Sequence, residues 1–501
     1  TRGVSGLIFI IKLTEQKKLH GGIKMKKKLF RFMSLVIMSL LLLSVLATGC
    51  SSKDEQDNGS TSQTNQTSQS SQNDGKKKEE VELVVASVNN GPMVTMSELS
   101  DVFTEQTGIK VSYVMLTEND IRSKIQQDVA VGGGQFDLVT LGTTDIGTYL
   151  DNGWTVALQP LFDKMTDEEK KWYDFDDLIK ANIPAYSSKT KGLAAIPLYG
   201  ESTMIMYRKD LFEEAGLTMP EEPTWEQIYE FAKKLHNPSK NIVGMALRGK
   251  PGYGENMYVF GTILYAYGAQ WFDMNWQPQL QTDEMKAAWE FYKKLQTEAG
   301  AKDVTSNGYT ETLNLMASGN AAIYYDATVS AAVFEADDSP IKGKVGYAMS
   351  PSGPGKGNTQ TIGGWGLAIT ASSKHQEEAF KYLTWVTSKD YVELVAEKEG
   401  WISVPSGART STYTNPNYKA VANFADITLK SLSNASFDRP AVNETPYDGN
   451  SLPNIPEYPS IGEQVGQILA DYISGGKSID DALAESQKIA LQAMKDGGYI
   501  N

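Results

Sequence analysis

Aromatic residues stand beside polar or charged ones at several points where strands are predicted to end. An aromatic ring can cover the apolar C–H face of a sugar-like molecule, and a carboxylate or an arginine fork can bind neighbouring hydroxyls. This mixture favours recognition of a small hydroxylated molecule, although each aromatic residue alone could equally be a core side chain near a turn. The pairs are Tyr199 with Glu201, Trp271 with Asp273, Tyr325 with Asp326, and Trp365 with Gly364.

Residue types that catalysis often requires are scarce. Histidine occurs 3 times, and His236 and His375 stand at edges of predicted helices, where a solvated role is expected. The single cysteine, Cys50, excludes an internal disulfide, a CxxC redox pair and a thiolate zinc site. No phosphate-binding GxxxxGK[ST] loop occurs. We therefore expect no catalytic residue, metal or cofactor. A carboxylate pair of the glycosidase type stays open, because such pairs have no characteristic spacing.

The elements that must position these residues begin near residue 81, where strands and helices start to alternate. Strands are predicted at 82–87, 111–116 and 136–141, with a helix at 94–106 and another from a capping box at Thr117 and Asp120 to Gly132. The alternation indicates βαβ units and a mainly parallel sheet. Ligands of such sheets bind beyond the carboxyl ends of the strands, which places Asn89-Asn90 and Thr143-Thr144-Asp145 near a cleft.

The stretch from Ile196 to Phe212 organises the rest of the chain. Pro197 should end a short apolar run, because proline cannot donate to a strand ladder. A polar loop is predicted from Tyr199 to Thr203, followed by a strand over 204–207 and a helix capped by Asp210. On the pattern alone, this is a loop, a strand and a helix of any α/β protein.

The second half supplies further loops and many helices. Thr224 and Gln227 form a predicted capping box, and a strand at 242–247 leads into the Gly/Pro-rich loop from Arg248 to Asn256. A turn is predicted at 268–273 and a glycine-rich lead-in at 363–366. Other predicted strands cover 321–325 and 367–370, and predicted helices cover 283–297, 311–318, 375–387, 390–398, 418–431, 459–475 and 478–495.

The first 80 residues carry targeting signals. Met25 is the expected start, and we expect residues 1–24 to be upstream sequence read in frame. Lys26, Lys27, Lys28 and Arg31 precede an apolar run over 32–47, which is shorter than the roughly 20 residues that span a bilayer. Small residues then precede Cys50, which resembles a lipoprotein signal peptide; a plain signal peptide is the alternative. Residues 51–74 are polar without periodicity, which is typical of a flexible tether.

Charge argues against two classes of partner. Residues 1–49 hold nine Lys and Arg and one Asp or Glu, a net of +8, so the remaining chain carries −14 − 8 = −22. We expect no nucleic-acid partner and no electrostatic attraction to an anionic membrane. Lipid on Cys50, with more than one acyl chain, would instead provide the anchor.

The stretch 196–212, the Arg248–Asn256 loop and the 268–273 turn resemble the extracellular solute-binding proteins of carbohydrate ABC importers, family 1, and their polyol branch for mannitol and sorbitol. The likeness covers nearly all of 81–501. It implies an α/β, two-lobed periplasmic-binding-protein (type II) fold similar to maltose-binding protein, each lobe a mainly parallel sheet flanked by helices, with a hinge between the lobes. We assign 81–200 and 327–370 to lobe 1 and 201–326 and 371–501 to lobe 2.

The resemblance and the loops together nominate the ligand-binding residues. The expected partners are a small carbohydrate or polyol, the permease subunits of an ABC transporter and the membrane through the lipid anchor, with a monomeric protein at the extracytoplasmic face of a Gram-positive bacterium. A receptor for another solute, such as an oligosaccharide or a polyamine, and a surface glycoside-active enzyme remain as alternatives. The nominated residues are Asn89, Asp145, Tyr199, Glu201, Arg248, Asn256, Trp271, Asp273, Asp326, Gly364, Trp365 and Arg439.

Overall fold

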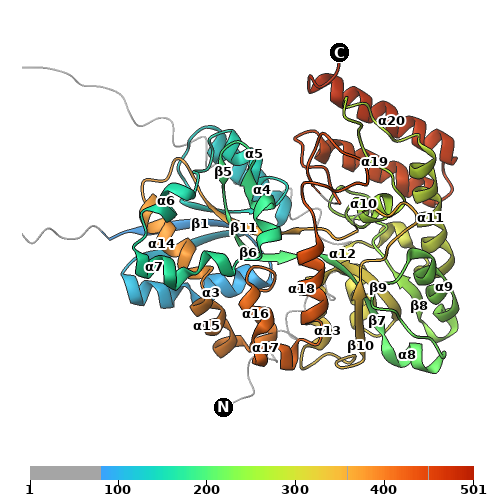
Figure 1. Ribbon diagram of the computed structural model, residues 1–501, viewed down its shortest axis with the longest axis horizontal. Helices are drawn as coiled ribbons and strands as arrows, with labels where there is room; N and C mark the ends of the chain where they lie inside the picture. Colours follow the sequence, from blue (N-terminus) through green and yellow to red (C-terminus); the bar gives the residue numbers. More distant parts are fainter. Residues whose placement is uncertain (1–79, 358, 450) are drawn as a thin grey trace, which may run out of the picture. The chain divides into compact units, whose positions relative to one another are not determined.

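The computed structural model describes residues 80–357, 359–449 and 451–501, which belong to one compact unit, Lys78–Asn501 (Figure 1). The predictions for residues 1–24, for the signal peptide at 25–49, for Cys50 and for the tether up to residue 79 lie outside the described residues. None of the helices within the described ranges combines the length and apolar character that a membrane crossing requires.

Eleven strands occur in the described residues: β1 (Glu82–Val88), β2 (Lys110–Leu116), β3 (Leu138–Gly142), β4 (Ser187–Ser188), β5 (Gly192–Leu193), β6 (Ile196–Glu201), β7 (Thr203–Arg208), β8 (Val243–Ala246), β9 (Ala321–Ala327), β10 (Val345–Met349) and β11 (Gly363–Ile369). The α-helices are α3 (Gly91–Thr107), α4 (Glu118–Ala130), α5 (Ile146–Asp151), α6 (Gln159–Asp163), α7 (Asp167–Tyr173), α8 (Lys209–Glu214), α9 (Trp225–Leu235), α10 (Asn256–Ala266), α11 (Asp283–Ala299), α12 (Tyr309–Ala317), α13 (Ala331–Glu335), α14 (Gln376–Val386), α15 (Lys389–Glu399), α16 (Thr410–Thr414), α17 (Pro416–Val421), α18 (Ala425–Asn434), α19 (Tyr458–Ile473) and α20 (Ile479–Asp496). Short 3₁₀ helices are η1 (Phe175–Asp177), η2 (Lys180–Tyr186), η3 (Pro238–Lys240), η4 (Val304–Ser306), η5 (Thr328–Ser330) and η6 (Trp401–Ser403).

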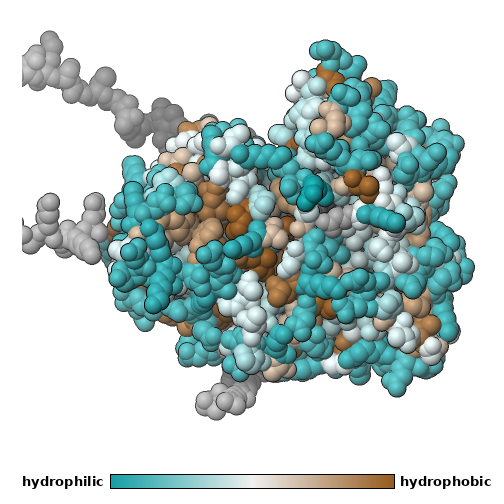
Figure 2. All heavy atoms as spheres, viewed as in Figure 1, coloured by the Kyte–Doolittle hydropathy of each residue, from teal (hydrophilic) through white to brown (hydrophobic). Residues whose placement is uncertain are grey.

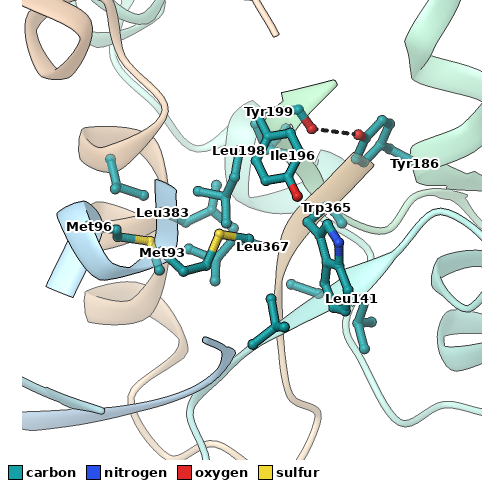
Figure 3. Packing of buried hydrophobic residues seen from close by; sticks show 14 of the residues in the cluster. Met93, Met96, Leu141, Tyr186, Ile196, Leu198, Tyr199, Trp365, Leu367 and Leu383 are labelled. Carbon is teal, nitrogen blue, oxygen red and sulfur yellow. Dashed lines mark hydrogen bonds between the residues drawn. The ribbon is translucent and has the colours of Figure 1, made fainter. Parts of the chain in front are cut away.

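The first sheet has the strand order β2-β1-β3-β11-β6. Its three N-terminal strands are the predicted ones, and β1 pairs in parallel with both β2 and β3. Strand β11 runs the opposite way, because it is antiparallel to both of its neighbours, β3 and β6. Helices α3 and α14 pack in the core of the first sheet. Figure 3 shows Met93, Leu383 and Leu367 among the buried side chains of this core.

The second sheet, with the order β10-β7-β9-β8, corrects the expectation of mainly parallel pairing. Only β8 and β9 pair in parallel, whereas β7 is antiparallel to both β9 and β10. Each large sheet thus contains one reversed strand, and in each sheet that strand is the first one after the chain arrives from the other sheet. The unpredicted strand β10 belongs here, so the assignment of 327–370 as a whole to lobe 1 is wrong.

The two passages between the sheets lie side by side. The chain leaves the first sheet in β6 and enters the second in β7, with Ser202 alone between them. The predicted polar loop 199–203 is therefore wrong, because Tyr199 to Glu201 pair with the strand β11. The glycine-rich lead-in at 363–366 is likewise the start of β11 and pairs with the same residues of β6.

Helix α14 corrects a second boundary. Although it lies after residue 371, it packs on β11 and α3, and its Phe380 belongs to the first core. The reason is that β11 is an interior strand of the first sheet, and the helix that directly follows this strand in the chain covers the same sheet. The assignment of all of 371–501 to lobe 2 is therefore wrong, whereas α19 and α20 do pack in the second core.

Local capping predictions had mixed outcomes. The Thr224–Gln227 capping box is present, with both reciprocal bonds. Thr117 is the N-cap of α4 but makes no side-chain cap bond, because its hydroxyl donates to Asp120 instead. Asp210 lies inside α8 and binds the side chain of Arg208, so it is not the cap. The helix predicted at 418–431 is divided into α17 and α18.

Candidate functional site

A cleft with a volume of about 980 Å³ lies where the passages between the two sheets meet. Its walls come from loops and helix ends of both sheets. Figure 2 shows hydrophilic residues over most of one face, with hydrophobic side chains gathered near the middle. The lining residues with hydrogen-bonding or aromatic side chains include Asn89, Asn90, Thr117, Glu118, Arg122, Thr143, Thr144, Tyr199, Glu201, Arg248, Tyr253, Glu255, Tyr258, Tyr309 and Trp365.

Half of the nominated residues line this cleft, and two more support it from behind. Asp145 and Asp326 are not lining residues, but each forms an ion pair with an arginine that lines the cleft. The nominated residues that line it are Asn89, Tyr199, Glu201, Arg248, Gly364 and Trp365.

Four nominated residues do not line the cleft. Asn256 is fully buried, where its amide donates to the Gly466 carbonyl and accepts from the Gly252 N–H, so it ties the start of α10 to α19. Trp271 is also fully buried and packs edge-to-face on Tyr458. Neither side chain reaches a ligand, because tertiary contacts occupy it.

Asp273 and Arg439 are local surface features. The carboxylate of Asp273 accepts the backbone N–H groups of Asn275 and Gln277, which closes the turn that follows Trp271. Arg439 is exposed, stands in an irregular segment and is not among the residues that line the cleft. The sequence indicated polar loops correctly at both places, but only the fold determines which loops converge.

Arg248 is held rigidly in the wall from the second sheet. Its Nε and Nη2 donate to both oxygens of Asp326 at 2.8 and 2.5 Å, and its Nη1 donates to the Gly254 carbonyl at 2.8 Å. The guanidinium also lies 4.8 Å from the ring centroids of both Tyr258 and Tyr309. Asp326 is fully buried on β9, so this pair is shielded from water. An arginine fork has more donors than these three bonds use, which leaves N–H groups for a ligand.

Glu201 closes the floor of the cleft at the end of β6. Its carboxylate accepts no hydrogen bond from another of the described residues, and Glu201 lines the cleft. Burial raises the pKa of Glu201 to about 7, against the lowering effect of Arg248 and with a further raising effect from Asp326 and Glu118. A carboxylate in this position can accept hydrogen bonds from two neighbouring hydroxyls.

Arg122, on α4, is the principal residue that the sequence analysis missed. Its guanidinium binds Glu118 at 2.9 Å and Asp145, and it lies 4.9 Å from the ring centroid of Trp365. The capping region of α4 was the available signal, because a helix that starts at the carboxyl end of β2 presents its first turns to the same cleft as Asn89. Arg122 and Arg248 thus face the cleft from opposite walls.

Tyrosines complete the lining, and of these only Tyr199 was nominated. The hydroxyl of Tyr199 accepts from the Asn90 amide at 3.1 Å, and its carbonyl accepts from the Tyr186 hydroxyl at 3.1 Å (Figure 3). The buried hydroxyl of Tyr258 has no hydrogen-bond partner among the described residues. Tyr309 stands at the first turn of α12, whereas the prediction began that helix at residue 311.

Gly364 is required by the close approach of the two passages. Its φ is 124°, and a Cβ there would lie 2.4 Å from the Tyr199 carbonyl oxygen, closer than side chains allow. A side chain at this position would therefore push β11 away from β6 and displace Trp365, which stands opposite Tyr199 in the same ladder. The nomination of Gly364 thus identifies a backbone role.

The chemistry of the cleft is that of hydrogen bonding to a polar molecule. No group of three or more His, Cys, Asp or Glu side chains in the described part of the chain is arranged to hold a metal ion. Hydroxyl, amide, guanidinium and carboxylate groups instead alternate with aromatic rings around the space. Such a lining can orient a hydroxylated ligand from several sides at once.

Two known proteins are each 40% identical to this chain. The mannitol-binding protein of Pseudomonas aeruginosa is 40% identical over 419 residues, which cover 83% of this chain and 94% of that protein. An ABC transporter solute-binding protein from Agrobacterium vitis, solved with bound D-mannitol, is also 40% identical; the alignment covers 83% of this chain and 99% of that one, with a TM-score of 0.77.

More distant structures share the architecture. A solute-binding protein from Agrobacterium radiobacter in complex with ribitol is 26% identical over 82% of this chain and 98% of its own, with a TM-score of 0.71. A maltose-bound protein from Thermotoga maritima, at 21% identity and a TM-score of 0.67, covers 82% of this chain and 99% of its own and shows the fold alone. These likenesses confirm the two-lobed periplasmic-binding-protein fold.

The family follows from these matches together with the cleft. Residues 89–393 match the family described as bacterial extracellular solute-binding protein. That range includes both passages between the lobes and both arginines of the cleft. The chain therefore belongs to the family of bacterial extracellular solute-binding proteins and is a binding protein, not an enzyme.

Proposed function

We propose that this protein captures an acyclic polyol, with a hexitol such as D-mannitol as the leading candidate, and delivers it to an ABC importer. The observation that carries the proposal is the 40% identity over 83% of the chain to a structure that contains D-mannitol. The mannitol-binding protein of Pseudomonas aeruginosa supports the same ligand class.

The lining of the cleft suits such a ligand. Glu201 accepts hydrogen bonds from ligand hydroxyls, while the free N–H groups of Arg248 donate to hydroxyl oxygens from the wall of the second sheet. Trp365 lies in the opposite wall and offers an apolar face to the carbon chain. A ligand gripped from both sheets favours closure of the lobes about β6–β7 and β10–β11, a hinge motion typical of periplasmic binding proteins.

A ligand screen tests the proposal. The chain from residue 50, with Cys50→Ala to avoid lipidation, is titrated calorimetrically with D-mannitol, ribitol, maltose and spermidine. We expect D-mannitol to bind, and at 100 times its Kd to stabilise the fold by about 2.7 kcal/mol. Binding of maltose or spermidine without any binding of an alditol would replace the proposal with the oligosaccharide or polyamine alternative. Chemical change of the recovered ligand would contradict a receptor role.

A lipid anchor on Cys50 is the second part of the proposal, and it is supported by the apolar run and the small residues that precede this cysteine. It holds a monomeric receptor at the extracytoplasmic face of the membrane of a Gram-positive host, next to the permease subunits. Cys50→Ala should release the protein into the medium with its binding activity unchanged. A variant that stays with membranes after a high-salt wash would contradict the anchor.

A further inference from the structure

The charged groups around the cleft differ in whether they have a partner of opposite charge. Nε and Nη2 of Arg248 both donate to Asp326, and Arg122 forms ion pairs with Glu118 and Asp145. Each cation therefore already has a carboxylate partner before any ligand enters. The carboxylate of Glu201, in contrast, makes no hydrogen bond to another of the described residues.

The position of Glu201 leaves its carboxylate available to a ligand. The residue ends β6 opposite Gly363 of β11, where a Cβ would lie 3.1 Å from a Glu201 carboxylate oxygen. The missing side chain of Gly363 makes room for the carboxylate to lie over the strand and face the cleft. Nothing larger than glycine at residue 363 would leave that space unchanged.

The cleft as a whole has an excess of negative charge. Besides Arg122 and Arg248, no lysine or arginine is present among the described residues that line it. The carboxylates that line or back it are Glu118, Asp145, Glu201, Glu255 and Asp326. Charges in a partly enclosed, low-dielectric space interact more strongly than in water. A cation placed beside Glu201 is therefore stabilised, and an anion there is repelled.

We infer that the cleft accepts a primary ammonium group in place of one ligand hydroxyl, so that 1-amino-1-deoxyalditols form a second ligand class with Glu201 as the counter-ion. The inference rests on the proposed polyol function, which supplies the rest of the ligand contacts. The same arrangement discriminates against aldonates, whose carboxylate would meet Glu201 without an arginine that lacks a carboxylate partner to receive it.

Proton linkage gives this inference a distinctive signature. The pKa of Glu201, raised to about 7 by burial, means that its carboxylate becomes largely ionised between pH 6 and pH 8. The ammonium stays protonated over that window, since a lysine ammonium titrates near 10.4 and the neighbouring hydroxyl of the alditol lowers this value without bringing it below about 8. Binding of the amine should therefore strengthen as pH rises from 6 to 8.

Arg248 and the tyrosines around Glu201 keep their charge states over the same window and therefore do not reverse this trend. Arg248 stays charged, and the hydroxyls of the neighbouring tyrosines stay protonated because burial and the Glu201 charge raise their pKa values. The charged or titratable groups that interact with Glu201 are Glu118, Tyr186, Tyr199, Arg248, Tyr258, Tyr309 and Asp326.

A ligand series of matched shape and different charge tests the inference on the unaltered cleft. D-mannitol, 1-amino-1-deoxy-D-mannitol and D-mannonate are titrated calorimetrically at pH 6 and pH 8. We expect the Kd of the amine to fall about tenfold between these pH values, which corresponds to 1.4 kcal/mol, while the Kd of D-mannitol changes much less. D-mannonate should bind more weakly than D-mannitol at pH 8.

Two variants assign the effect to one carboxylate. Glu201→Gln should abolish the pH dependence of amine binding. Glu255→Gln also removes a carboxylate, but this one already accepts a hydrogen bond from the Tyr309 N–H, so the pH dependence of amine binding should remain. Binding of D-mannitol without the amine, or amine binding that Glu201→Gln leaves pH-dependent, would overturn the inference but leave the polyol function intact. Failure of all three ligands to bind would instead contradict the proposed function.

Discussion

The two arginines of the cleft each pair with a carboxylate and pack on an aromatic ring, but their environments differ. The Arg248 side chain is 9% exposed, lies between two tyrosine rings and is paired with a fully buried aspartate on an interior strand. The Arg122 side chain is 22% exposed, lies on a helix over one tryptophan and is paired with partly exposed carboxylates. One wall therefore presents a buried cation and the other a partly exposed one.

The contrast separates scaffold from adjustable recognition. A buried ion pair contributes little net stability as a pair, but removing one partner leaves an uncompensated charge that is costly. A partly exposed pair is worth less, because water and salt screen part of its interaction. We therefore expect changes at Arg248 to alter both folding and binding, and changes at Arg122 to alter mainly binding.

The largest expected effect is the loss of Asp326. Asp326→Ala leaves Arg248 buried without its partner and should lower the free energy of unfolding by about 3–5 kcal/mol. Urea unfolding of the unliganded protein measures this change. A cost near that of an exposed pair would show that water replaces Asp326 and would remove the distinction between the walls. Should the alanine variant fail to fold, Asp326→Asn gives the same test with the shape retained.

The second effect concerns ligand affinity. Arg122→Ala should weaken binding of D-mannitol by about 1.5–3 kcal/mol, the range for a charged hydrogen bond, while the melting temperature of the empty protein moves little. Arg248→Ala should weaken binding and destabilise the empty protein together, because it leaves Asp326 buried without its partner. Arg439→Ala, at an exposed arginine outside the cleft lining, is the matched control and should bind normally. Normal affinity in Arg122→Ala would confine that residue to a surface pair.

The third effect is the pH dependence of stability that Glu201 imposes. Its pKa of about 7 in the fold exceeds the ordinary value of 4.5, so between these values the folded protein holds a proton that the unfolded chain has lost. The free energy of unfolding should therefore fall as pH rises through this window and stay lower above it. Glu201→Gln should be more stable than the parent at pH 8 by about 1–3 kcal/mol and should lose that slope. An unchanged slope would assign the pH dependence to other groups.

The smallest effect is expected at Asp145. Asp145→Ala leaves Arg122 paired with Glu118, so stability should fall by at most about 1 kcal/mol, and by less at high salt. The comparison with Asp326→Ala in the same urea series gives the difference between the walls directly. A loss at Asp145 as large as that at Asp326, and insensitive to salt, would mean that the first wall is as rigid as the second.

Much of the local structure was predictable because its causes are local. Strand β1 and helix α3 follow from an apolar run and from a stop at Gly108, whose φ of 75° suits glycine. The Thr224–Gln227 box needs only residues within one turn of helix. The resemblance of the 196–212 stretch to sugar-importer receptors identified the family before any contact between distant residues was known.

The sequence by itself therefore determined the family, the alternation of strands and helices, and the residue types that a polar cleft requires. It could not decide which polar loops meet.

Tyr199 to Glu201 and Gly363 to Trp365 look like loops in isolation but become strands, because each supplies the hydrogen-bond partners of the other across more than 160 positions of the chain. Arg248 and Asp326 stand 78 positions apart and are joined only when β8 and β9 pair. Trp271 and Trp365 are both tryptophans beside polar residues, yet one packs on Tyr458 in the core and the other lines the cleft. Burial depends on what the rest of the chain brings alongside, so the membership of the site was decided by the tertiary structure alone.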